Sequence, residues 1–165
     1  MKFPWDTKIQ DLPKLQKTLA PLRQTGARVV FTNGCFDLLH VGHLATLDAA
    51  KAQGDILVVG LNSDSSVQGL KGPTRPLQPQ FERAQLLAAL ACVDFVIIFE
   101  QATPLDLLSI LRPDVHVKGG DYLASQLPET PLIESYGGRV HIAPIAQGRS
   151  TTGLKKGLEK ALADS

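Results

Sequence analysis

The sequence predicts an α/β fold, a Rossmann-like doubly wound sheet of about five parallel strands with helices on both faces. Two observations favour this class: short apolar, β-branched runs alternate with helical patterns, and those runs are continuous rather than alternating apolar with polar. The length of 165 residues suits one domain. We therefore expect a single domain over 1–165, with 1–26 as an N-terminal helical extension.

The elements follow one another in a regular order. A first helix is expected at 11–24, ended by Gly26, and the run RVVF begins the first strand at 28–32. Further apolar runs predict strands at 56–62, 95–99, 115–118 and 140–144. Helical patterns between and after them predict helices at 41–53, 80–90, 104–111, 131–136 and 151–163. The segment 71–79, KGPTRPLQP, is rich in Pro and Gly and is expected to be a surface flap.

Composition narrows the classes of function. A net charge of +1 gives little field to attract nucleic acid or an anionic membrane, so neither is an expected partner. The two cysteines lack the spacing of a zinc site or redox pair, which fits a reduced compartment. The start MKFPWDTK has no apolar signal segment, and no apolar run is long enough to span a bilayer. We expect a cytoplasmic protein.

Polar strings follow the predicted strands, where ligands bind in an open α/β sheet. TNGCFD follows the first strand, NSD the second, KGGDY the fourth and AQGRSTT the last. Directly after TNGCFD, His40 and His43 are one helical turn apart at the start of a predicted helix. Unpaired backbone N–H groups and the helix dipole favour a phosphate there, and the imidazoles can donate to phosphoryl oxygens.

Other interpretations of this stretch are weaker. Gly34 could simply permit a tight turn and Asp37 could cap the helix, with the histidines as ordinary helix residues. Zinc proteases use H-E-x-x-H, which is absent. Neither the P-loop motif nor G-x-G-x-x-G is present, so phosphate must be bound in another way.

The string GCFDLLHVGH at 34–43 resembles the G-x-F-D-x-x-H-x-G-H signature of the nucleotidyltransferase superfamily that contains the cytidylyltransferases. The superfamily's second motif, S-T-T at the start of the last helix, is matched at 150–152. Within the superfamily the chain most resembles the adenylyltransferases of D-glycero-D-manno-heptose 1-phosphate, through strings such as LKGPTRP, VKGGDY and GRSTTGL. The residue before S-T-T, often apolar or aromatic in the family, is Arg149 here and adds a charge near the expected triphosphate.

The resemblance implies transfer of AMP from ATP to a sugar 1-phosphate, with pyrophosphate released and ADP-heptose formed for bacterial surface glycans. It implies catalytic roles for His40, His43 and Lys71. Nucleotide contacts are expected at Asn33, Gly34, Cys35, Phe36, Asp37, Gly42, Lys118, Gly119, Asp121, Arg149, Ser150, Thr151 and Thr152. Acceptor contacts are expected at Asp64, Lys71, Arg75 and Arg83. Mg²⁺ is the expected metal, with Asp37 as its candidate carboxylate ligand.

Several alternatives stay open at this level. Lys71 and Arg75 could be solvated loop charges, and Arg83 could form an ion pair on a helix face. The same fold could instead serve a cytidylyltransferase for glycerol 3-phosphate or a similar alcohol phosphate, or an adenylyltransferase for FMN or phosphopantetheine. A non-enzymatic nucleotide-sensing or scaffold module is a further alternative. The resemblance also suggests a homodimer.

Overall fold

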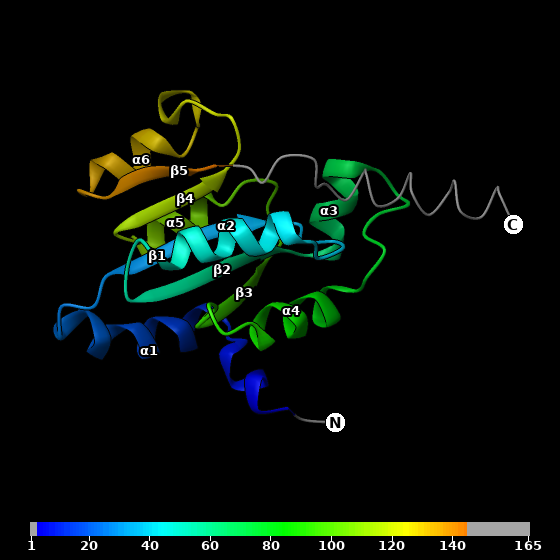
Figure 1. The fold of residues 1–165 in the computed structure, drawn as a ribbon, viewed down its shortest axis with the longest axis horizontal. Coiled ribbons are helices and arrows are strands. Elements are labelled where there is room, and N and C mark those ends of the chain that lie inside the picture. Colours follow the sequence, from blue (N-terminus) through cyan, green and yellow to red (C-terminus); the bar gives the residue numbers. More distant parts are fainter. Residues whose placement is uncertain (1–2, 145–165) are drawn as a thin grey trace, which may run out of the picture.

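The computed structural model describes residues 3–144, and its core is a five-stranded, fully parallel sheet (Figure 1). The strands are β1 (Val29–Gly34), β2 (Ile56–Asn62), β3 (Phe95–Phe99), β4 (Val115–Gly119) and β5 (Arg139–Ala143), in the spatial order β3-β2-β1-β4-β5. The α-helices are α1 (Leu12–Gln24), α2 (Val41–Lys51), α3 (Asp64–Lys71), α4 (Gln80–Ala89), α5 (Leu105–Leu111) and α6 (Thr130–Ser135). The predicted doubly wound α/β fold is confirmed.

Helices lie over both faces of the sheet (Figure 1), and an apolar cluster on each face holds the layers together. On one face, Leu47 of α2 and Leu87 of α4 pack against Val30 and Val59. On the other, α1, α5 and α6 cover the side chains that alternate with these. That second cluster contains Leu15, Leu19, Phe31, Val58, Leu107, Leu108 and Ile133. Because both faces are covered, the central strands read as continuous apolar runs in the sequence.

Helix α3 is the main element that the sequence prediction missed. Ser63 caps it, its hydroxyl accepting a hydrogen bond from the Ser66 amide at 3.2 Å. Gly69 inside the helix and Gly72 at its end weakened the helical pattern, although a serine cap followed by Asp64 in the first turn is an ordinary start signal. The chain also forms short 3₁₀-helices η1 (Pro4–Lys8) and η2 (Ala124–Gln126). The helix predicted at 151–163 lies outside the described residues.

The strand order reverses between β1 and β4. From β1 the chain moves outward through β2 to β3, and it then returns to the other side of β1 for β4 and β5. The loops after β1 and β4 therefore leave the sheet in opposite directions, which opens a crevice beyond their carboxyl ends. The two strands pair directly, with Phe31 beside His116 and Thr32 beside Val117.

Candidate active site

A cavity of about 180 Å³ opens at this reversal point. Its walls come from the end of β1 and the following turn, from α2, from the end of α3 and from the end of β4. The lining residues are Thr32, Asn33, Gly34, Cys35, Phe36, Asp37, His43, Thr46, Lys71 and Gly119. A larger hollow of about 370 Å³ lies between α1 and α5, but it contains none of the predicted site residues. We therefore assign the candidate site to the smaller cavity.

The turn between β1 and α2 is held in an unusual conformation. Phe36 has a φ of 43°, in the left-handed region that side-chain-bearing residues rarely adopt. Its buried ring packs on the His43 ring, with the centroids 5.1 Å apart. Packing in the core therefore stabilises a strained turn beside the cavity, as is common at functional sites.

The two histidines of the signature stack on each other, with ring centroids 3.8 Å apart and planes 23° from parallel. His40 is the N-cap of α2, and its Nδ1 accepts a hydrogen bond from the Gly42 amide at 3.1 Å. Since Nδ1 accepts, a neutral His40 ring carries its proton on Nε2. Burial lowers the pKa of His40, which favours this neutral form. His40, and not Asp37 as the alternative interpretation held, therefore caps α2 through Nδ1, while Nε2–H is a donor on the other side of the ring.

His43 lies deeper and faces the cavity. Burial, followed by the charges of His40 and Lys71, lowers its pKa to about 4. Nδ1 is buried without a hydrogen bond of normal geometry among the described residues, although the nearby Leu38 carbonyl weakly opposes the lowering. At neutral pH the pair is therefore uncharged, and positive charge in the cavity comes from Lys71 at the end of α3.

Asp37 anchors the segment 71–79 to the signature turn. Its carboxylate accepts from Arg75 Nη1 at 2.6 Å, from the Leu77 amide at 2.6 Å and from the Gln78 amide at 3.3 Å. Burial raises the pKa of Asp37, but these donors outweigh it, and the net pKa is lowered. The segment predicted to be a surface flap is thus tied to the site through a buried carboxylate.

This geometry bears on the predicted metal ligand. The Asp37 side chain is only 1% exposed, and both of its oxygens already accept hydrogen bonds. Among residues 3–144 no group of three or more His, Cys, Asp or Glu side chains is close enough to hold a metal ion. Asp37 therefore does not fit the role of a direct Mg²⁺ ligand in this conformation.

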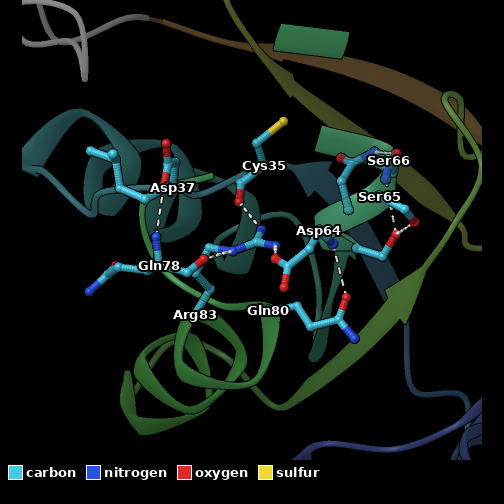
Figure 2. A network of polar contacts seen from close by, with 11 residues as sticks. Cys35, Asp37, Asp64, Ser65, Ser66, Gln78, Gln80 and Arg83 are labelled. Atoms are coloured by element: carbon cyan, nitrogen blue, oxygen red, sulfur yellow. Dashed lines mark hydrogen bonds and ion pairs between the residues drawn. The ribbon is translucent and has the colours of Figure 1, made fainter. Parts of the chain in front are cut away.

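Arg83 is buried in this structure rather than exposed at the cavity entrance, and it is part of a polar network with the signature turn and the start of α3 (Figure 2). Its guanidinium donates to three acceptors, the Gln78 carbonyl at 2.9 Å, the Cys35 carbonyl, and Asp64 Oδ1 at 2.7 Å. The alternative of an ion pair describes it better. Because its hydrogen bonds link α4 to the signature turn and to the start of α3, Arg83 stabilises the arrangement of these elements around the site. Arg75 is likewise paired, through its ion pair with Asp37, and its side chain is 15% exposed.

The structure brings together most of the remaining predicted residues. Asn33, Gly34, Cys35 and Gly119 line the cavity with His43 and Lys71. Lys118 contacts Asn33 Oδ1 at 3.3 Å, whereas Asp121 is exposed in the turn after β4 and makes no hydrogen bond to a described residue. Arg149, Ser150, Thr151 and Thr152 lie outside the described part of the chain.

Sequence reasoning missed two lining residues, Thr32 and Thr46. Thr46 is three residues after His43 on α2, and this helical spacing could have identified it. It also explains Gly119, because a Cβ there would lie 2.7 Å from Thr46 Oγ1. The glycine thus allows α2 to approach the end of β4 closely enough to close the cavity.

Comparison with known proteins extends this picture. A family model described as cytidylyltransferase-like matches residues 31–146. The chain is 53% identical over 150 residues to the bifunctional protein HldE of Syntrophotalea carbinolica, covering 91% of this chain and 31% of that protein. It is 59% identical over 130 residues to the HldE of Acidiphilium cryptum, covering 79% and 27%. The chain thus spans about a third or less of these relatives' length.

Two solved structures are also similar. The lipopolysaccharide core biosynthesis protein of Thermoplasma volcanium is 28% identical, with a TM-score of 0.61 over 75% of this chain and 100% of that one. Pantoate-beta-alanine ligase of Francisella tularensis is 17% identical, with a TM-score of 0.59 over 88% and 69%, and supports the fold alone. No helix within residues 3–144 has the length and apolar character needed to cross a membrane.

Proposed function

The chain belongs to the cytidylyltransferase-like family, and we propose that it transfers AMP from ATP to D-glycero-D-manno-heptose 1-phosphate. The products are ADP-heptose and pyrophosphate. The sequence signature, the S-T-T motif and the strings that resemble heptose 1-phosphate adenylyltransferases support this activity. Similarity to proteins named bifunctional protein HldE and to a lipopolysaccharide core biosynthesis protein supports the same choice.

The observation that carries the proposal is a neutral His43 beside Lys71 in a cavity at the strand-order reversal, with His40 stacked on the His43 ring. A neutral imidazole donates an N–H hydrogen bond without adding charge, and His40 has its proton on Nε2, facing away from the helix backbone. Lys71 adds a cation to the same cavity. This set suits phosphoryl oxygens, on which negative charge increases during displacement.

The chemistry needs little more than alignment and charge stabilisation. An anionic oxygen of the sugar phosphate attacks the α-phosphorus of ATP and forms a new P–O bond. The bond between the α-phosphorus and the bridging oxygen to the β-phosphate breaks, and pyrophosphate leaves with that electron pair. No proton has to be removed from the nucleophile, so the histidines act as hydrogen-bond donors and Lys71 as a cation.

Magnesium enters this scheme with the nucleotide. Mg²⁺ is commonly held by substrate phosphates and water with one or two carboxylates. Since Asp37 is enclosed by Arg75 and the loop amides, we assign no step to a metal held by this chain. The homodimer, the cytoplasmic location and the nucleotide contacts of Ser150, Thr151 and Thr152 stay predictions.

Pyrophosphate release tests the proposal. The purified chain is incubated with ATP or CTP and with heptose 1-phosphate, glycerol 3-phosphate, FMN or phosphopantetheine, and reactions without an acceptor serve as controls. We expect release only with ATP and heptose 1-phosphate. A His43→Ala variant should lose the signal, whereas His141→Ala on β5 should retain it.

The other outcomes identify the alternatives. Release with CTP and glycerol 3-phosphate would make the chain a cytidylyltransferase. Release with ATP and FMN or phosphopantetheine would keep the adenylyltransferase chemistry but replace the acceptor. No release with any combination, together with measurable ATP binding, would indicate a nucleotide-binding module without transferase activity.

A further inference from the structure

Behind the cavity, a buried histidine that the proposed reaction does not use contacts a cavity-lining residue. His116 on β4 is fully buried, and its Nε2 lies 3.2 Å from Asn33 Oδ1. Lys118 Nζ lies 3.3 Å from the same oxygen and 3.4 Å from Glu129 Oε1. Residues two apart in a strand point to the same face of the sheet, which is why His116 and Lys118 both reach Asn33 on the neighbouring strand.

These contacts determine the orientation of the Asn33 amide. The Lys118 ammonium only donates hydrogen bonds, so the Asn33 atom beside it must be the carbonyl oxygen. His116 Nε2 must then donate as well, and a neutral His116 has its proton on Nε2 and none on the buried Nδ1. Burial, followed by the charge of Lys118, keeps the ring neutral by lowering the pKa of His116 to about 3.

The remaining end of the amide, Nδ2, is left for a ligand. Within residues 3–144 it makes no hydrogen bond, and it is not among the buried polar atoms that lack a partner. Asn33 is partly exposed and lines the cavity. A planar amide whose oxygen is held by two donors presents its NH₂ group in one fixed direction, away from those donors.

We propose that His116 is a positioning residue that, through its Nε2–H, fixes the Asn33 amide so that Nδ2 donates to a phosphoryl oxygen of a substrate in the cavity. Lys118 supports the same orientation by donating to the same oxygen, and Glu129 in turn contacts Lys118. The inference rests on the proposed function for the identity of the substrates, ATP and heptose 1-phosphate. The hydrogen-bond pattern itself does not depend on that identity.

A double-mutant cycle on pyrophosphate release tests the proposal. His116→Leu removes the donor and fills its place with an apolar side chain, and it should lower kcat/KM about 3- to 10-fold, the value of one hydrogen bond. Asn33→Ala should lower it at least as much, and the double variant should be no worse than Asn33→Ala. His116→Gln keeps an N–H donor at similar reach and should remain within about 2-fold of the wild type.

Two controls separate positioning from folding. Val117→Ala changes a buried neighbour on the opposite face of β4, and it should lower the melting temperature without lowering kcat/KM. Separate KM values for ATP and heptose 1-phosphate show which substrate supplies the phosphoryl oxygen. Losses that multiply in the double variant, a fully active His116→Leu, or a His116→Gln as impaired as His116→Leu would each overturn the proposal.

Two readouts do not require turnover. Nitrogen-15 NMR of labelled wild-type protein should find the His116 proton on Nε2 at neutral pH, and a proton on Nδ1 would overturn the proposed orientation. Dissociation constants for ATP and heptose 1-phosphate should rise for at least one ligand in Asn33→Ala. If the wild type binds a substrate but releases no pyrophosphate, the proposed function fails, while these two measurements still test the His116 tautomer and the Asn33 contact on which the inference rests.

Discussion

Mild acid should destabilise the fold through His116. In the folded protein its pKa is about 3, because of burial and then the charge of Lys118, against an ordinary value of 6.5. Between these values the unfolded chain binds a proton that the folded chain does not, so the free energy of unfolding decreases as the pH falls. For these two pKa values, linkage gives a loss of about 2 kcal/mol between pH 7 and pH 5.

Urea unfolding at the two pH values measures this loss. His116→Gln cannot titrate, so its free energy of unfolding should fall by about 2 kcal/mol less than that of the wild type. His43, whose pKa is also lowered, is present in both proteins and cancels in the comparison. The control variant His141→Gln keeps the buried His116 imidazole, so its free energy of unfolding should fall by as much as that of the wild type. Equal losses in His116→Gln and wild type would refute the reasoning.

Three further predictions concern the site. His43→Ala should lower kcat by roughly 10²–10³-fold with little change in the KM for ATP, because its contact strengthens in the transition state; weaker ATP binding with normal kcat would contradict this role. Lys71→Ala should raise the KM for the sugar phosphate and, by removing a nearby cation, raise the pKa of His43 in an NMR titration; an effect confined to ATP would assign this lysine to the triphosphate. Thr151→Val should weaken ATP but not AMP binding in calorimetric titrations; a lower melting temperature with normal ATP affinity would identify Thr151 as a helix cap only.

The sequence by itself determined the order and type of most elements. Strand β2 and strand β3 were predicted with the observed bounds, since a parallel strand covered on both faces needs an unbroken apolar run. The G-x-F-D-x-x-H-x-G-H signature also located the cavity, because the turn after the first strand of such a sheet lies at its ligand-binding edge. These features follow from the local periodicity of the sequence together with general rules of sheet topology, so a single sequence is enough to predict them.

Only the tertiary structure decided the roles of the charged and polar side chains around the cavity. Asp37 and Arg75 are 38 residues apart, and Asn33 and His116 are 83 apart, yet each pair is in hydrogen-bond contact. No local sequence pattern distinguishes a buried arginine that links several elements, such as Arg83, from a solvent-exposed arginine, because the same residue type occurs in both environments. Partners of this kind are selected by strand register and loop packing, so they become visible only when the sheet has brought distant residues together.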